Sequence, residues 1–200
     1  MPQTSPHRLI LASASPRRAT LLTDAGYRFE QVIAQVDEGA VALDGLPIPE
    51  AVKTLARVKA ANVAEQRDQG IIIGCDTMVV ADGAGMGKPT DAPDARRMLE
   101  LLVGRPHEVV TGVALIDAMS GNKEIFCDEA TVTIAAPPPA EIDRYLSSGQ
   151  WQGKAGGYNL AELRDRWSIN VVGDPTTVIG LPMQRLSEAL DQMTRGTDIS

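Results

Sequence analysis

The sequence predicts an α/β protein in which helices flank a mixed β-sheet, and three observations support this class. Segments with strand character alternate with segments of helical periodicity, which is the order typical of α/β folds. Two adjacent segments rich in Val, Ile and Thr are separated only by a short turn, so one antiparallel hairpin should lie within the sheet. Aromatic residues make up 4% of the chain, so the core must be built from Ala, Val, Leu and Ile.

The first part of the chain supplies three predicted strands and two predicted helices. They are a strand at residues 7–12, a helix at 16–25, a strand at 28–35, a helix at 49–67, a strand at 71–80 and, after it, a glycine-rich turn at 82–87. Short apolar or alternating runs indicate the first two strands. Pro16 suits the start of its helix and Gly26 its end, while Ala51, Leu55 and Val58 mark one apolar face of the longer helix. The third strand is apolar almost throughout, which predicts burial on both faces.

The second part supplies a hairpin and three helices. They are a helix at residues 91–103, strands at 108–116 and 124–134 around a turn at 119–122, a helix that ends near Gly149, and a last helix at 181–193. Pro93 and several acidic side chains lie near the beginning of the first of these helices, where both are favourable. Residues 36–48 and 150–177 are predicted linkers. Since no internal repeat is present, residues 1–200 are expected to form a single domain.

The charge balance argues against one class of function. A formal net charge of -7 and a pI of 4.9 argue against a surface that binds nucleic acid polymers, because such surfaces are normally basic. A small anion remains compatible with this charge if cations gather in one cleft.

No apolar run approaches the roughly 20 residues of a membrane-spanning helix, so we expect no membrane contact and a cytoplasmic location. Cys75 and Cys127 show neither a disulfide framework nor a zinc spacing, and both should be reduced, packed residues.

The most unusual local feature is a helix that begins with two arginines. Ser15 is a natural N-cap before Pro16, but Arg17 and Arg18 then place two cations where the helix already presents partial positive charge. A phosphate group would relieve this, because free backbone amides, the Ser13 and Ser15 hydroxyls and the guanidinium groups would bind it together. The alternative is that both arginines face solvent or pair with surface acids.

A second feature is an acid within an apolar strand. Asp76 interrupts the buried run, and a carboxylate there usually has a metal, a cation or a hydrogen-bond partner. Glu38 could join it around Mg²⁺, which prefers oxygen ligands and often binds through one or two carboxylates plus substrate phosphates. Lys59 and Lys88 are positioned to bring ammonium groups to the same place. The alternatives are a turn-capping Asp76, an exposed loop acid at Glu38 and a surface lysine at Lys59.

Other familiar catalytic patterns are absent from the sequence. The segment before Lys88 lacks the first glycine and the Ser or Thr of a Walker loop, and its glycines have the wrong spacing for a dinucleotide fingerprint. There is no Gly-x-Ser-x-Gly elbow, and the two histidines, His7 and His107, have no partner pattern around them. Serine hydrolase chemistry therefore has no support.

A series of ordered motifs resembles a known family. The motifs are Ser13-Ala14-Ser15-Pro16-Arg17-Arg18 with Leu21-Leu22, Val36-Asp37-Glu38, Ala56 to Ala60 around Lys59, Asp76-Thr77, Gly87-Lys88-Pro89, His107-Glu108-Val109-Val110-Thr111-Gly112, Gly153-Lys154-Ala155-Gly156-Gly157-Tyr158 and Gly180-Leu181-Pro182. In this order they are similar to the Maf (septum-formation-inhibitor-like) nucleotide pyrophosphatases, over nearly the whole chain. The resemblance implies a two-lobed fold like that of the inosine triphosphate pyrophosphatases, often dimeric, with the site in the cleft between lobes.

The same resemblance implies an activity and roles for single residues. The activity is Mg²⁺- or Mn²⁺-dependent cleavage of a nucleoside triphosphate to monophosphate and pyrophosphate. Asp76 would orient or deprotonate the attacking water, and Glu38 would help it to hold the metal. The phosphate-contacting positions correspond to Ser13, Arg17, Arg18, Lys59 and Lys88.

The nucleobase of the substrate is indicated less directly than the reaction. Pro16-Arg17-Arg18 and Asp76-Thr77 are similar to the branch that acts on dTTP and UTP. That branch usually has Gln at the position of Ala161, and Glu162 follows it here. Modified pyrimidine nucleotides therefore remain candidate substrates beside dTTP and UTP. Thr77 and Glu162 complete the predicted substrate-binding set. The rival hypotheses are a nucleotide-binding regulator of cell division with little turnover and, more remotely, a nucleic-acid-binding module.

Overall fold

The structure, a computed structural model, describes residues 8–195, which fall into two compact units. Unit 1 contains residues 8–76, 111–128 and 180–195, and unit 2 contains residues 77–110 and 129–179. The strands are β1 (Leu9–Ala12), β2 (Phe29–Val32), β3 (Ile71–Ala81), β4 (Ala84–Met86), β5 (Pro106–Asp117), β6 (Lys123–Ile134) and β7 (Ile169–Val172). The helices are α1 (Pro16–Asp24), α2 (Ile48–Ala64), α3 (Ala92–Leu102), α4 (Pro139–Ser147), α5 (Leu160–Leu163), α6 (Pro175–Ile179) and α7 (Met183–Arg195), with 3-10 turns at Glu38–Ala40 and Ala155–Gly157.

The seven strands form one mixed sheet, as the sequence predicts. Its order is β2-β1-β3-β5-β6-β7, with β4 paired to β3. β1 runs parallel to β2 and β3, whereas β4 is antiparallel to β3 and β7 is antiparallel to β6. β5 and β6 are neighbours joined by the predicted turn, in which the Asp117 amide donates to the Asn122 carbonyl over 2.9 Å. The predicted α/β class, with a mixed sheet and flanking helices, is confirmed.

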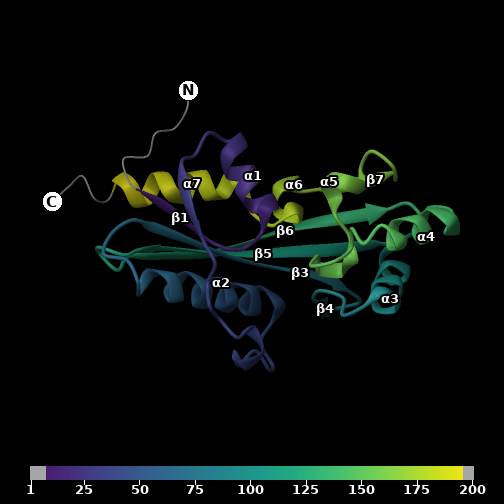
Figure 1. Cartoon of the computed structure of the whole chain (residues 1–200), viewed down its shortest axis with the longest axis horizontal. Coiled ribbons are helices and arrows are strands. Elements are labelled where there is room, and N and C mark those ends of the chain that lie inside the picture. The colour runs from purple at the N-terminus through teal and green to yellow at the C-terminus, as the bar shows by residue number, and fades with distance from the viewer. Residues whose placement is uncertain (1–7, 196–200) are drawn as a thin grey trace. The chain divides into compact units, whose positions relative to one another are not determined.

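Unit 1 has a helix layer on each face of its strands. The side chains of β1 alternate between the two layers: Ile10 and Ala12 pack with α2, whereas Leu9 and Leu11 pack with α1 and α7. α2 lies on one face and α1 and α7 on the other (Figure 1). All four residues of β1 are at most 1% exposed, and burial of each large aliphatic side chain contributes roughly 2 kcal/mol to the free energy of unfolding.

Two glycines allow α2 to approach the sheet closely. A Cβ atom at Gly74 of β3 would lie 2.2 Å from the Ala56 carbonyl oxygen and 2.8 Å from the Ala60 backbone nitrogen. A Cβ atom at Gly112 of β5 would lie 2.5 Å from the Val52 carbonyl oxygen. Real Cβ atoms do not approach backbone atoms this closely, so both positions require glycine. The helix backbone therefore lies directly against the two strands.

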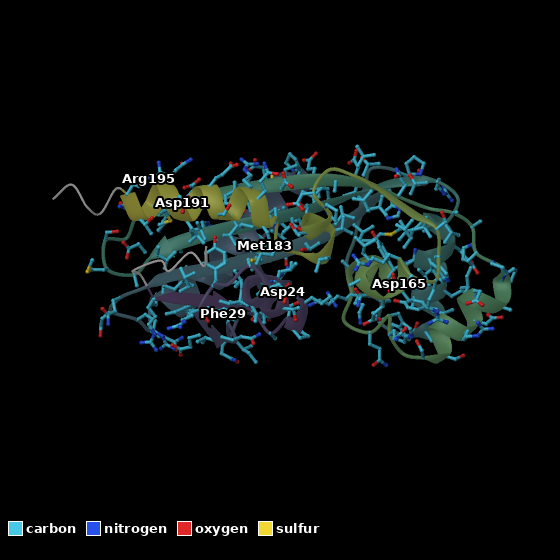
Figure 2. All side chains as sticks on the ribbon, turned by 90° about the horizontal axis from the view of Figure 1, so that it is seen from above. Asp24, Phe29, Asp165, Met183, Asp191 and Arg195 are labelled. Atoms are coloured by element: carbon cyan, nitrogen blue, oxygen red, sulfur yellow. The ribbon has the colours of Figure 1, made fainter. Side chains whose placement is uncertain are left out.

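The buried face of α7 follows helical periodicity. Leu186, Ala189 and Leu190 are buried, while the helix runs from Met183 past Asp191 to Arg195 (Figure 2). Its observed start lies two positions after the predicted one. Across the described part of the chain, the longest and most apolar helices still fall short of what a membrane span requires.

The hydrophobic core of unit 2 includes much of the segment that is predicted to be a linker, and that prediction is wrong. Residues 150–177 contain α5, β7 and most of α6, and they contribute Trp151, Tyr158, Leu160, Leu163 and Trp167 to the hydrophobic core of unit 2. The aromatic side chains are spaced irregularly over very short elements, so no period of 2 or 3.6 residues marks the segment. Residues 84–86 also differ from the predicted turn, because they form β4 in a tight hairpin with β3.

His107 is a buried histidine held in unit 2. Its Nε2 lies 3.0 Å from the Tyr158 hydroxyl oxygen, and the two rings pack edge to face. Burial lowers the pKa of His107 to about 4, although the nearby backbone of Arg105 and Leu102 acts in the opposite direction. The imidazole is therefore neutral at pH 7 and serves packing. His7, the other histidine, lies outside the described residues.

The buried imidazole predicts a pH-dependent stability. Unfolded His107 takes up a proton near pH 6.5 and folded His107 only near pH 4, so the free energy of unfolding should be constant above pH 6.5 and fall between pH 6.5 and 4. The loss from this group is roughly 3 kcal/mol. Urea unfolding of the wild type and of His107→Gln at several pH values measures the contribution of His107 to the free energy of unfolding. Parallel stability curves for the two proteins would show that His107 makes no such contribution.

Candidate active site

The predicted phosphate cradle follows β1 and forms the beginning of α1. Ser15 takes the N-cap position, but its side chain makes no cap hydrogen bond; instead its backbone amide donates to the Ser13 hydroxyl over 3.2 Å. Arg18 also donates to the Ser13 hydroxyl, from Nη1 over 3.0 Å, and its Nε donates to the Gly180 carbonyl over 2.7 Å. Arg17 lies half-buried in the first turn of α1. Arg18 is therefore held in place by contacts within the protein.

The register of the sheet places Asp76 beside this cradle. Ala12, the last residue of β1, pairs with Gly74 of β3, so Asp76 lies just beyond the end of β1, at the level of the segment that leads into α1. Clefts in open α/β sheets usually lie at this carboxyl edge of parallel strands. Side chains alternate along β3, so Asp76 faces α2, like Gly74. It is 8% exposed.

Lys59 joins the two predicted acidic residues. Its Nζ lies 2.6 Å from Asp76 Oδ1 and 3.1 Å from Glu38 Oε1. The side chains of Lys59 and Asp76 are 12% and 11% exposed, whereas that of Glu38 is 46% exposed. Glu38 lies in a 3-10 turn that begins where the Asp37 side chain accepts a hydrogen bond from the Gly39 amide over 3.0 Å. Two predicted acidic residues from separate elements thus contact the ammonium group of a third predicted residue, Lys59.

The Asp76 carboxyl is a stronger base than an ordinary aspartate. Burial raises its pKa above the usual range, and the nearby Glu38 carboxylate raises it further. The Lys59 ammonium and the Arg18 guanidinium lower the pKa but do not cancel the effect of burial. The influence of Arg18 means that the helix start and the strand aspartate share one electrostatic environment. A raised pKa brings a carboxylate closer to what proton abstraction at neutral pH requires.

The carboxylates of Glu38 and Asp76 fit a hard divalent cation whose other ligands are water and substrate oxygens. Glu38 and Asp76 offer carboxylate oxygens, and the Lys59 ammonium between them shows that the two side chains can share one positive charge. Within residues 8–195, no three His, Cys, Asp or Glu side chains form a complete protein cage for a metal ion. Mg²⁺ commonly binds through one or two carboxylates and completes its shell with water and substrate phosphates.

The remaining predicted residues belong to unit 2 or to the core. Thr77 follows Asp76 on β3 and is half-buried, whereas Lys88 and Glu162 are exposed, after β4 and on α5 respectively. Their roles in substrate binding stay predictions. Cys75 is fully buried and burial raises the pKa of its thiol to about 11, as expected for a packed, reduced cysteine.

Three supporting residues were not predicted. Gln31 of β2 donates from Nε2 to the Ser13 carbonyl over 2.8 Å, and Gly180 accepts from Arg18. Gln31 carries no signal in the sequence, and Gly180 stands there only within the Gly180-Leu181-Pro182 motif without an assigned contact, because both contacts join segments far apart along the chain. Gly74 does carry one: a glycine inside a buried strand indicates a bulge or the close approach of another backbone.

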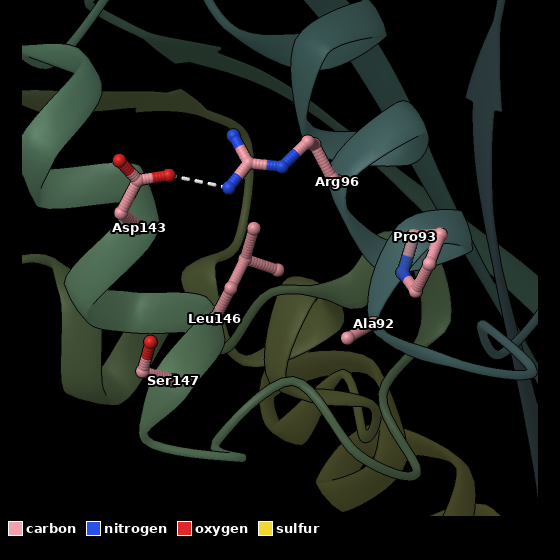
Figure 3. A pocket seen from close by; sticks show the side chains of 6 residues that line it. All are labelled: Ala92, Pro93, Arg96, Asp143, Leu146 and Ser147. Atoms are coloured by element: carbon pink, nitrogen blue, oxygen red, sulfur yellow. Dashed lines mark hydrogen bonds and ion pairs between the residues drawn. The ribbon is translucent and has the colours of Figure 1, made fainter.

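A groove on unit 2 is separate from these residues. It has a volume of ≈ 550 Å³ and lies between α3 and α4, where Arg96 and Asp143 form an ion pair across it (Figure 3). Its other lining residues are Ala92, Pro93, Leu146 and Ser147. None of the predicted site residues lines this groove.

Comparisons with known proteins identify the family to which the chain is similar. The family model of Maf-like proteins matches residues 8–193. The dTTP/UTP pyrophosphatase of Desulforamulus reducens is 40% identical over 182 residues, which cover 91% of this chain and 94% of the relative. The proteins of the same name from Symbiobacterium thermophilum and Bacillus cytotoxicus are each 40% identical, over 186 and 190 residues, which cover 92% and 94% of this chain and 93% and 97% of the relatives.

Proposed function

Because this chain belongs to the Maf-like protein family, we propose that it is a nucleoside triphosphate pyrophosphatase that hydrolyses dTTP and UTP to the monophosphate and pyrophosphate. The observation that carries this proposal is the cluster of Glu38, Lys59 and Asp76 beside the arginine-rich start of α1. A buried base and several cations within one environment suit hydrolysis of an anionic substrate.

The residues of this chain have separable tasks in the reaction. The phosphate oxygens are held by the Arg17 and Arg18 guanidiniums, by the Ser13 and Ser15 hydroxyls and by backbone amides of the first turn of α1. Asp76 orients a water molecule and accepts its proton as the water oxygen bonds to phosphorus. The bond between the α- and β-phosphates breaks, pyrophosphate leaves with the bonding electrons, and the monophosphate remains. The Lys59 ammonium stabilises the negative charge that develops on the phosphate oxygens during the reaction.

Glu38 and Asp76 are the proposed ligands of Mg²⁺ or Mn²⁺, which when bound supplies positive charge to the phosphate oxygens. Thr77, Lys88 and Glu162 are proposed to complete the substrate-binding set. The two units are proposed to form one Maf-like domain, with the substrate in a cleft between lobes as in the inosine triphosphate pyrophosphatase-like fold. Homodimer formation and a cytoplasmic location also remain predictions.

The choice of dTTP and UTP rests on the names of the relatives and on the residues shared with that branch. Ala161 departs from the branch pattern, and it is exposed on α5 beside Glu162. The test is a panel of dTTP, UTP, modified pyrimidine triphosphates and purine triphosphates, each incubated with Mg²⁺ or Mn²⁺. We expect the highest kcat/KM with the two unmodified pyrimidine nucleotides. Preference for a purine triphosphate would overturn the assignment, and tight nucleotide binding without turnover would favour the division regulator.

A further inference from the structure

Lys59 occupies the position between the carboxylates that a divalent cation is proposed to use. Its ammonium lies within 2.6 Å of Asp76 and 3.1 Å of Glu38, and both Lys59 and Asp76 are almost excluded from solvent. An ammonium held this way neutralises charge that would otherwise attract a metal ion, and interactions between charges at such burial are stronger than in water. The contacts of Lys59 with Asp76 and Glu38 are thus made entirely by residues of this chain.

The balance of charge at this cluster changes when a triphosphate arrives. Two carboxylates and one ammonium carry one net negative charge, so a divalent cation entering alone would face the Lys59 ammonium at close range. A triphosphate offers that ammonium new anionic partners, and the long, flexible lysine side chain can turn toward them. The two carboxylate groups are then available to the cation.

We propose that Lys59 is an internal competitor for the divalent cation, which keeps the metal weakly bound until a triphosphate draws the ammonium away. This inference rests on the proposed function in that it assigns Glu38 and Asp76 to metal binding. It adds an order of events: the metal enters productively with the nucleotide, as a complex. Metal and nucleotide must consequently strengthen each other's binding.

Mn²⁺ titration of the nucleotide-free full-length protein, by calorimetry, tests the competition. Lys59→Met should bind Mn²⁺ at least about tenfold more tightly than wild type, because the competing charge is gone. Lys59→Arg keeps the charge and should bind Mn²⁺ as weakly as wild type. Lys53→Met is the matched control, since Lys53 lies on the same helix and pairs with Glu50 over 2.7 Å, away from the cluster. This control should leave Mn²⁺ affinity unchanged.

Unchanged, weaker or undetectable Mn²⁺ binding in Lys59→Met, with the variant shown by thermal unfolding to be folded, would overturn the proposal. Equal tightening in Lys53→Met would also overturn it, because the effect would then reflect net charge alone. Pyrophosphate release from dTTP by the wild-type sample is measured separately. Tighter Mn²⁺ binding in Lys59→Met together with no turnover of dTTP by the wild type would reject the proposed function and support competition between Lys59 and the metal ion. Unchanged Mn²⁺ binding in Lys59→Met together with turnover by the wild type would reject only the competition.

Discussion

Asp76→Asn should lower pyrophosphate release from dTTP by at least about a thousandfold. The amide is nearly the same size as the carboxyl, but it accepts no proton at neutral pH and carries no charge for Lys59 or a metal ion. Burial already makes the Asp76 carboxylate costly, so the variant should still unfold cooperatively. Steady-state rates at saturating dTTP, together with thermal unfolding, measure the two effects separately.

Asp117→Asn is the matched control for this substitution. Asp117 is also a buried aspartate of unit 1, but its carboxylate accepts hydrogen bonds from Met119 and Ser120 in the β5–β6 turn. That variant should lose some stability and keep its turnover within about twofold of wild type. If Asp76→Asn retained a tenth or more of the wild-type rate, Asp76 would not be the base.

Gly74→Ala should lower the free energy of unfolding by about 3 kcal/mol or more, because the added methyl group meets the backbone of α2 and neither element can move without disturbing the core. For a chain of this length, that loss corresponds to a fall in melting temperature of roughly 6 to 12 °C. Thermal and urea unfolding measure it. The same displacement of α2 would draw Lys59 away from Asp76, so turnover should fall as well.

Gly87→Ala provides the comparison. A Cβ atom there meets no described atom within 4 Å beyond its chain neighbours, so the free energy of unfolding should change by less than about 0.5 kcal/mol. If Gly74→Ala were as stable as Gly87→Ala, the close approach of α2 to β3 would not exist in solution.

Most of the fold of unit 1 was predictable from the sequence because its helices and strands carry clear hydrophobic patterns. The fully buried β1, the amphipathic α2 and the apolar first part of β3 are each recognisable from an apolar run or from one apolar helix face. The observed bounds differ mainly at the ends, as for β2, which is shorter than the predicted strand. Residues 150–177 were missed because their burial comes from scattered aromatic side chains and short elements, which only tertiary packing reveals.

The sequence indicated Glu38, Lys59 and Asp76 as candidate residues, but it did not indicate the contacts that bring them together. An acid inside an apolar strand and two arginines at a helix start contradict local preference, and such conflicts mark functional positions. The sequence does not contain the information that Arg18 donates to Ser13 and Gly180, or that one lysine joins Glu38 to Asp76. Those contacts depend on the register of β1 with β3 and on the close packing of α2.

The most direct test of the account is the identity of the products formed from dTTP. Phosphorus NMR of dTTP incubated with the wild-type protein and Mg²⁺ or Mn²⁺ should show dTMP and pyrophosphate in equal amounts, with no signal above background when a chelator removes the metal. Formation of dTDP and orthophosphate, or complete absence of turnover despite nucleotide binding, would contradict it.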